Sequence, residues 1–219
     1  MASGGGLTQV GVHKVFTGAG CNRIVNNVSW GACNLVSFGP QNAVAIFSPE
    51  SAQILATLPG HKAYVNCTHW LPSNKFSFKA KHLKRHYLLS GDVDGVIILW
   101  ELSLVDKKWR NVLQVPEAHK KGVTCFSAIM ASHSDAIFAS TSSDGTVKLW
   151  EVIFPSSSAG DCRFSCLDSI TVGKKPMVAL SLMDFPGNSH YLALAMGGLD
   201  NKIHSYSVER TGNSSMPVN

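Results

Sequence analysis

The sequence predicts an all-β fold, built as about three and a half blades of a larger β-propeller. The first observation is that the stretch LLSGDVDGVIILWEL at 88–102 returns at 139–152 as ASTSSDGTVKLWEV. The second is that each copy reads as two strands rich in β-branched and aromatic residues, joined by an Asp-Gly turn. The third is that weaker copies surround Asn42 and Asp200. Hairpins that recur at roughly forty to fifty-six residues indicate four-stranded propeller blades.

The four expected blades follow one another along the chain, at 22–60, 61–116, 117–172 and 173–210. The first is degenerate, because Phe38 stands where the strong copy has Ser90, and Ser48 where it has Trp100. In the fourth, Tyr206 replaces the tryptophan and no outer strand follows.

Closed propellers need about four to eight blades. We therefore expect this chain to be a fragment or truncated form of a longer propeller, or to borrow strands from a partner, since a half blade leaves an unpaired edge. The polar ends at 1–11 and 211–219 are expected to be disordered.

Both strong copies carry polar side chains that could satisfy one another within a blade. If they meet, the imidazole can bond the carboxylate, and the hydroxyl and indole N–H find partners as well, which buried polar groups require. The two predicted sets are His61, Ser90, Asp94 and Trp100, and His119, Ser140, Asp144 and Trp150.

Such a set resembles a catalytic triad beside a tryptophan, but its repetition favours a structural network. An enzyme needs one reacting centre, whereas a network that locks a blade is needed in every blade. The glycines at 18–20 and 197–198 lack the lysine and the strand-to-helix context of a phosphate loop. We therefore predict no catalytic residue, no bound cofactor and no enzymatic activity.

Composition agrees with a protein of buried strands, since apolar residues make up 45% of the 219 and charged residues 15%. No apolar run approaches the roughly 18 residues of a membrane span, and the first twenty residues do not read as a signal peptide. We expect a soluble intracellular protein with no membrane contact.

The six cysteines are too widely spread for a disulfide framework. Cys67 and Cys125 occupy matching places in apolar strand patterns and are predicted to be buried free thiols. Cys162 and Cys166 have no second pair at zinc spacing, so we predict no metal site.

The net charge of +5 originates in one segment, KFSFKAKHLKRH at 75–86, which contains no acid. The segment accounts for an insertion of eight residues in the first strong copy, because His61 precedes Ser90 by twenty-nine residues whereas His119 precedes Ser140 by twenty-one. Its aromatic residues could stack on bases while its cations neutralise phosphates. A solvated loop or a loop that docks on an acidic protein are the alternatives. The cations are Lys75, Lys79, Lys81, Lys84 and Arg85.

Longer stretches carry a resemblance to a known family. They are GAGCNRIVNNVSWG, LVSFGPQNAVAIFSPESAQILATLPGHKAYVNCTHWLP, HYLLSGDVDGVIILWEL, HKKGVTC and GGLDNKI. In this order they closely resemble the N-terminal part of the Elongator complex protein 2 family, with a plant-like character. Because they cover nearly the whole chain, the resemblance is more specific than generic WD repeats. It implies a WD-repeat subunit whose full form has two seven-bladed propellers, of which this chain would supply the first blades.

The resemblance also implies a function, that of a non-catalytic scaffold in the Elongator complex. Its expected partners are the large first subunit and the third subunit, which carries the chemistry. That complex modifies the wobble uridine of transfer RNA at C5 and is linked to transcription elongation, which implies a location in cytoplasm and nucleus. A transfer RNA contact by the basic segment is a further possibility. The alternative function is a generic WD-repeat adaptor, such as a substrate receptor of a ubiquitin ligase.

Overall fold

The computed structural model describes residues 20–72, 85–103, 106, 108–132, 134–155 and 160–210. Within these residues the chain forms fifteen strands and no helix. The first sheet contains β1 (Val28–Trp30), β2 (Val36–Phe38), β3 (Ala43–Ser48) and β4 (Gln53–Pro59). The second contains β5 (Val65–Trp70), β6 (Arg85–Asp92), β7 (Ile97–Ser103) and β8 (Lys108–Val115). The third contains β9 (Val123–Met130), β10 (Asp135–Ser142), β11 (Thr146–Ile153) and β12 (Arg163–Thr171). The fourth contains β13 (Met177–Asp184), β14 (Tyr191–Gly198) and β15 (Ile203–Glu209).

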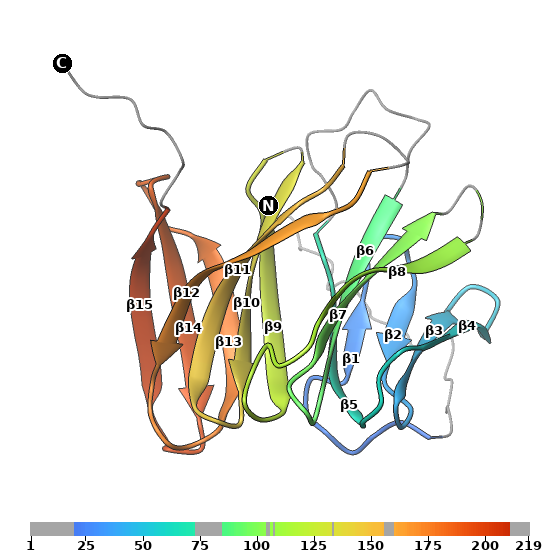
Figure 1. The fold of residues 1–219 in the computed structure, drawn as a ribbon, viewed down its shortest axis with the longest axis horizontal. Helices are drawn as coiled ribbons and strands as arrows, with labels where there is room; N and C mark the ends of the chain where they lie inside the picture. The colour runs from blue at the N-terminus through green and yellow to red at the C-terminus, as the bar shows by residue number, and fades with distance from the viewer. Residues whose placement is uncertain are drawn as a thin grey trace, which may run out of the picture.

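The sheets stand side by side in chain order, from blue β1–β4 to orange-red β13–β15 (Figure 1). Within each sheet the strands are antiparallel and follow one another in sequence. The first strands of the sheets, β1, β5, β9 and β13, lie beside one another. Three four-stranded blades and one three-stranded sheet confirm the prediction of a propeller with about three and a half blades.

Apolar layers between neighbouring sheets hold the blades together. Successive side chains of a strand point to opposite faces, so Leu88 of β6 packs against the first sheet while Leu89 packs against the third. Ile98 and Leu99 of β7 divide in the same way. A further layer joins the third and fourth sheets around Met177. Because both faces of these strands are covered, neighbouring positions such as Leu88 and Leu89 are both apolar, whereas the buried polar residues of the same strands form hydrogen bonds.

The Asp-Gly turns are fixed by the approach of the next blade. Gly95 and Gly145 both have a φ of 82°, which L side chains rarely adopt. A side chain at Gly95 would also run into the carbonyl of His119, and one at Gly145 into the carbonyl of Gly173. In return, Gly95 O accepts the His119 N–H at 3.1 Å. The turn of one blade is thus bonded to the loop that enters the next.

Three other predictions concern the ends of the chain, the cysteines and membrane contact. The terminal ranges 1–11 and 211–219 lie outside the described residues. Cys67 and Cys125 are buried and form no disulfide, which confirms that prediction. Burial raises the pKa of the Cys67 thiol well above its usual value and that of Cys125 to about 11, so both stay protonated at neutral pH. The described part of the chain contains no helix long and apolar enough to cross a membrane.

Candidate functional site

A chain of hydrogen bonds runs through the second blade and joins four side chains. Trp100 Nε1 donates to Ser90 Oγ at 2.8 Å, Ser90 Oγ lies 2.7 Å from His61 Nε2, and His61 Nδ1 lies 2.7 Å from Asp92 Oδ2. Because the Asp92 carboxylate only accepts, the imidazole proton sits on Nδ1 and is donated to it. In that tautomer Nε2 is an acceptor, so the Ser90 hydroxyl accepts the indole proton and donates its own to Nε2. Every polar group of the set is therefore satisfied.

The carboxylate of this network is Asp92, whereas the sequence-based prediction placed Asp94 there. Asp92 is the last residue of β6 and lies two positions after Ser90, so both side chains emerge on one face of the strand. It is 1% exposed, whereas Asp94 sits in the turn and is exposed to solvent. The second oxygen of Asp92 accepts the N–H groups of Asp94, at 3.0 Å, and of Val96, at 2.9 Å. One buried carboxylate thus holds both the imidazole and the turn.

The third blade builds a related chain with one additional link. Trp150 Nε1 donates to Ser140 Oγ at 2.8 Å, and Ser140 Oγ lies 2.7 Å from His119 Nε2. His119 Nδ1 then meets the hydroxyl of Thr146 at 2.9 Å, and that hydroxyl donates to Asp144 Oδ1 at 2.6 Å. His119 Nδ1 is 4.0 Å from the carboxylate itself. Asp144 therefore belongs to the network through a threonine that sequence reasoning missed.

The pKa shifts of His119 and Asp144 agree with their places in the hydrogen-bond network. Burial lowers the pKa of His119 to about 4, so the imidazole is neutral at physiological pH, as its donor and acceptor positions require. Burial also acts to raise the pKa of Asp144, but hydrogen bonds from the Thr146 hydroxyl and N–H and from the Lys120 N–H, together with the charge interaction with His119, outweigh it, and the pKa falls below its usual value. The carboxylate stays ionised while the imidazole stays neutral.

These networks are closed to substrates. Ser90 and Ser140 are 0% exposed, and both imidazoles are buried. A nucleophile has to reach its substrate, whereas each of these hydroxyls is enclosed and already bonded to a ring on either side. What the arrangement does is tie the loop before each inner strand to the middle strands of the same sheet. Among the described residues, no group of three His, Cys, Asp or Glu side chains is placed to hold a metal ion.

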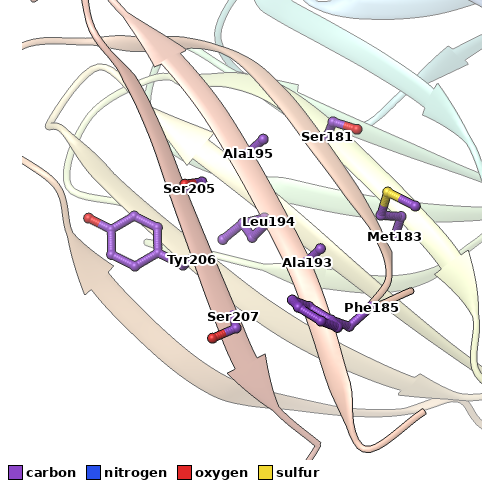
Figure 2. A pocket seen from close by; sticks show the side chains of 9 residues that line it. All are labelled: Ser181, Met183, Phe185, Ala193, Leu194, Ala195, Ser205, Tyr206 and Ser207. Carbon is purple, nitrogen blue, oxygen red and sulfur yellow. The ribbon is translucent and has the colours of Figure 1, made fainter. Parts of the chain in front are cut away.

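A hollow lies on the fourth sheet, between β13, β14 and β15. Figure 2 shows its lining, in which Met183, Phe185, Leu194 and Tyr206 are the large side chains among alanines and serines. The lining contains no carboxylate, imidazole, thiol or ammonium group that could carry acid–base chemistry. In the second and third sheets the corresponding face is covered by the sheet that follows in the chain.

The basic segment is only partly described. Lys75, Lys79, Lys81 and Lys84 lie outside the described residues. Arg85 begins β6, and its Nη1 is 3.3 Å from Glu101 Oε2. Arg85 is therefore a strand residue paired with a buried carboxylate. This corrects its assignment as a loop cation that is free to contact a partner. That same carboxylate also accepts bonds from Tyr87 and Arg110.

Asn26 is a structural residue that the sequence did not single out. It lies just before β1 with a φ of 71°. Its carbonyl accepts the Thr68 N–H of β5 at 3.3 Å, and its amide donates to the carbonyls of Thr124 in β9, at 3.2 Å, and Val178 in β13, at 2.7 Å. One residue, through its carbonyl and its side-chain amide, thus joins the first blade to the inner strands of the other three. Nothing in the repeat pattern marks it, because it stands outside the repeating hairpins.

Comparison with known proteins agrees with this architecture. The WD domain, G-beta repeat family matches residues 52–101 and 110–151. Elongator complex protein 2 of Arabidopsis thaliana is 65% identical over 94% of this chain, and the protein of that name from Dictyostelium discoideum is 34% identical over 87%. The chain spans about a quarter of these relatives, 24% and 22% of their lengths. The crystal structure of Saccharomyces cerevisiae Sqt1 superposes with a TM-score of 0.62 at 16% identity, covering 84% of this chain and 45% of that one, which is a likeness of fold.

Proposed function

This chain is a WD-repeat relative of Elongator complex protein 2, and from that premise we propose that it serves as a non-catalytic scaffold subunit of the Elongator complex. The observation that carries the proposal is the 65% identity over 94% of the chain. Through that assembly it supports modification of the wobble uridine of transfer RNA at C5, and it contributes to transcription elongation. Its partners are the large first subunit and the catalytic third subunit, and it acts in cytoplasm and nucleus.

The geometry supports a scaffold in preference to an enzyme. The groups that resemble a triad, His61, Ser90 and Asp92, are buried and bonded to one another. The same arrangement serves a second blade around His119 and Ser140. Side chains that are buried and bonded to one another within a blade are available for neither nucleophilic attack nor proton transfer to a substrate.

Affinity purification of the tagged protein from cells of its source organism tests the assembly. We expect the large first and the catalytic third Elongator subunits to be recovered with it, as identified by mass spectrometry, and to be missing from a parallel purification of an unrelated WD-repeat protein with the same tag. Recovery without the large subunit rejects the proposal. Recovery with ubiquitin-ligase subunits instead favours the alternative, a WD-repeat substrate receptor.

A second measurement addresses the transfer RNA. Deletion of the gene should lower C5-modified wobble uridine in hydrolysed transfer RNA, as measured by mass spectrometry of nucleosides, and the wild-type gene should restore it. An RNA contact by the basic segment predicts that a variant with Lys79, Lys81 and Lys84 changed to serine binds transfer RNA more weakly and with a smaller salt slope. An unchanged salt slope leaves that segment a protein contact or a solvated surface.

A further inference from the structure

The loops that enter the inner strands β5, β9 and β13 carry lysine at one repeated position. The third residue before each strand is Lys62, Lys120 and Lys174, respectively, and in the latter two loops a second lysine follows. All five side chains are exposed. We call this set, Lys62, Lys120, Lys121, Lys174 and Lys175, the lysine rim. The blade networks do not use these ammonium groups, although they hold the backbone beneath them.

One repeated hydrogen bond places the three loops alike. In each of these three blades, the turn between the two middle strands donates an N–H to the carbonyl of the residue just before the inner strand. The bonds run from Val93 to Tyr64 (3.0 Å), from Ser143 to Gly122 (2.9 Å) and from Leu199 to Pro176 (2.9 Å). Because each lysine precedes the accepting residue by one or two positions, the lysine rim lies at one end of the blades, beside the inner strands.

Hydrogen bonds within and between blades hold the backbone at this end. Gly95 O accepts the N–H of His119, the residue before Lys120. Asp144 Oδ2 accepts the Lys120 N–H itself at 3.1 Å. Gly145 O accepts the Gly173 N–H, next to Lys174, at 3.4 Å. The positive charges are thus presented from an ordered backbone, which lowers the entropy that binding would otherwise cost.

The surroundings of the lysine rim are mixed. Tyr64 is 59% exposed and Leu199 61% exposed, and both belong to the bonded pairs described above. Asp94 and Glu117 are exposed carboxylates of the same turns and loops, and Asp144 and Asp200 are partly exposed ones, so these acids are fewer than the five lysines. This end of the molecule therefore combines excess positive charge with apolar side chains and a few acids.

We propose that the lysine rim is a docking surface for an acidic peptide segment of a partner protein, with carboxylates on the lysines and apolar side chains on Tyr64 and Leu199. Nucleic acid fits less well, because its phosphates are closely spaced and continuous. Asp94 and Glu117, which interrupt the rim, would oppose some of those phosphates. A peptide can place apolar residues there and carboxylates at the lysines.

Binding of short fluorescein-labelled probes to the intact chain, followed by fluorescence anisotropy, tests this surface. The first probe alternates glutamate and valine, and the second is oligouridylate of equal length. The rim variant is Lys120→Ser/Lys174→Ser. The matched control is Lys108→Ser/Arg163→Ser, which removes two exposed charges from the starts of β8 and β12, at the opposite end of the blades. Circular dichroism verifies that both variants are folded.

We expect the glutamate probe to bind the wild-type chain more tightly than oligouridylate. The rim variant should bind it about tenfold more weakly, since two solvent-exposed ion pairs are lost. The control should change the affinity by less than about twofold, and added salt should weaken binding to the wild type. Absence of glutamate-probe binding, or equal loss in both variants, overturns the proposal. Tighter, rim-dependent binding of oligouridylate overturns it in favour of nucleic acid.

Discussion

Replacing one aspartate or the other in GDVDG separates the two possible carboxylates of the second blade. Asp92→Ala removes the acceptor of His61 Nδ1–H and of two turn N–H groups, whereas Asp94→Ala removes a carboxylate exposed to solvent. The substitutions delete the same chemical group two residues apart. Any difference between them therefore reports on the position of the carboxylate and not on its charge.

The expected magnitudes follow from burial. The His61 ring is buried, so its orphaned N–H costs about 1–3 kcal/mol, and the loss of the turn bonds to Asp94 and Val96 brings the total to about 3 kcal/mol. For a chain of this size that corresponds to a fall in melting temperature of about 6–12 °C. Asp94→Ala should stay within about 0.5 kcal/mol, as surface substitutions usually do.

Urea unfolding, followed by the fluorescence of the buried tryptophans, measures both variants beside the parent chain. Asp92→Asn adds a refinement, because its amide oxygen can still accept the turn N–H groups while its NH₂ faces the donating Nδ1 of His61. It should therefore lose less stability than Asp92→Ala but more than Asp94→Ala. Equal losses for Asp92→Ala and Asp94→Ala, or a greater loss for Asp94→Ala, would refute the network described here.

Three further predictions concern pH, the inner strands and the turns. The pKa of His119 is about 4 in the folded chain and about 6.5 in the unfolded chain, so the unfolded chain binds the proton more readily. The contribution of His119 to the free energy of unfolding is therefore fully present above pH 6.5, and about 3 kcal/mol of it is lost by pH 4. His119→Gln should partly flatten the dependence of the urea midpoint on pH. The flattening is only partial because burial also lowers the pKa of His69 to about 4. An unchanged pH dependence would contradict the role of His119. Asn26→Gly, which keeps the left-handed backbone but deletes two amide bonds to the inner strands, should cost about 2 kcal/mol in urea unfolding, and parent-like stability would exclude the cross-blade role. Gly95→Ala should lower the melting temperature more than Gly187→Ala, which shares the positive φ but has open space around it, and equal shifts would show that only φ matters.

Much of the second and third blades could be predicted from residue types and spacing. Serine and tryptophan stand ten residues apart in both copies, and in the structure their hydroxyl and indole are bonded. Such a pair lies on adjacent strands of one hairpin, so local sequence is enough to bring it together. The Asp-Gly turns are local in the same sense.

The choice of carboxylate needed the structure. GDVDG offers two aspartates, and which of them faces the imidazole depends on where β6 ends and on which side of the sheet each side chain emerges. In the third blade Ser142 occupies the place of Asp92, and Thr146 carries the connection to Asp144. Repetition of sequence therefore does not imply repetition of every contact.

By itself, the sequence determined that this protein is made of repeated hairpins with a histidine, a serine and a tryptophan in each strong copy, because those contacts lie within one blade and within a few tens of residues. Only the tertiary structure decided how blades are joined. Asn26 meets the carbonyl of Val178, 152 residues away, and Gly95 has to be glycine because the loop before β9 passes against it. The lysine rim also belongs to the tertiary structure, since three separate loops share one end of the molecule only after the sheets have stacked. Contacts of this kind arise from sheet packing, which sets distances in space independently of distances along the chain.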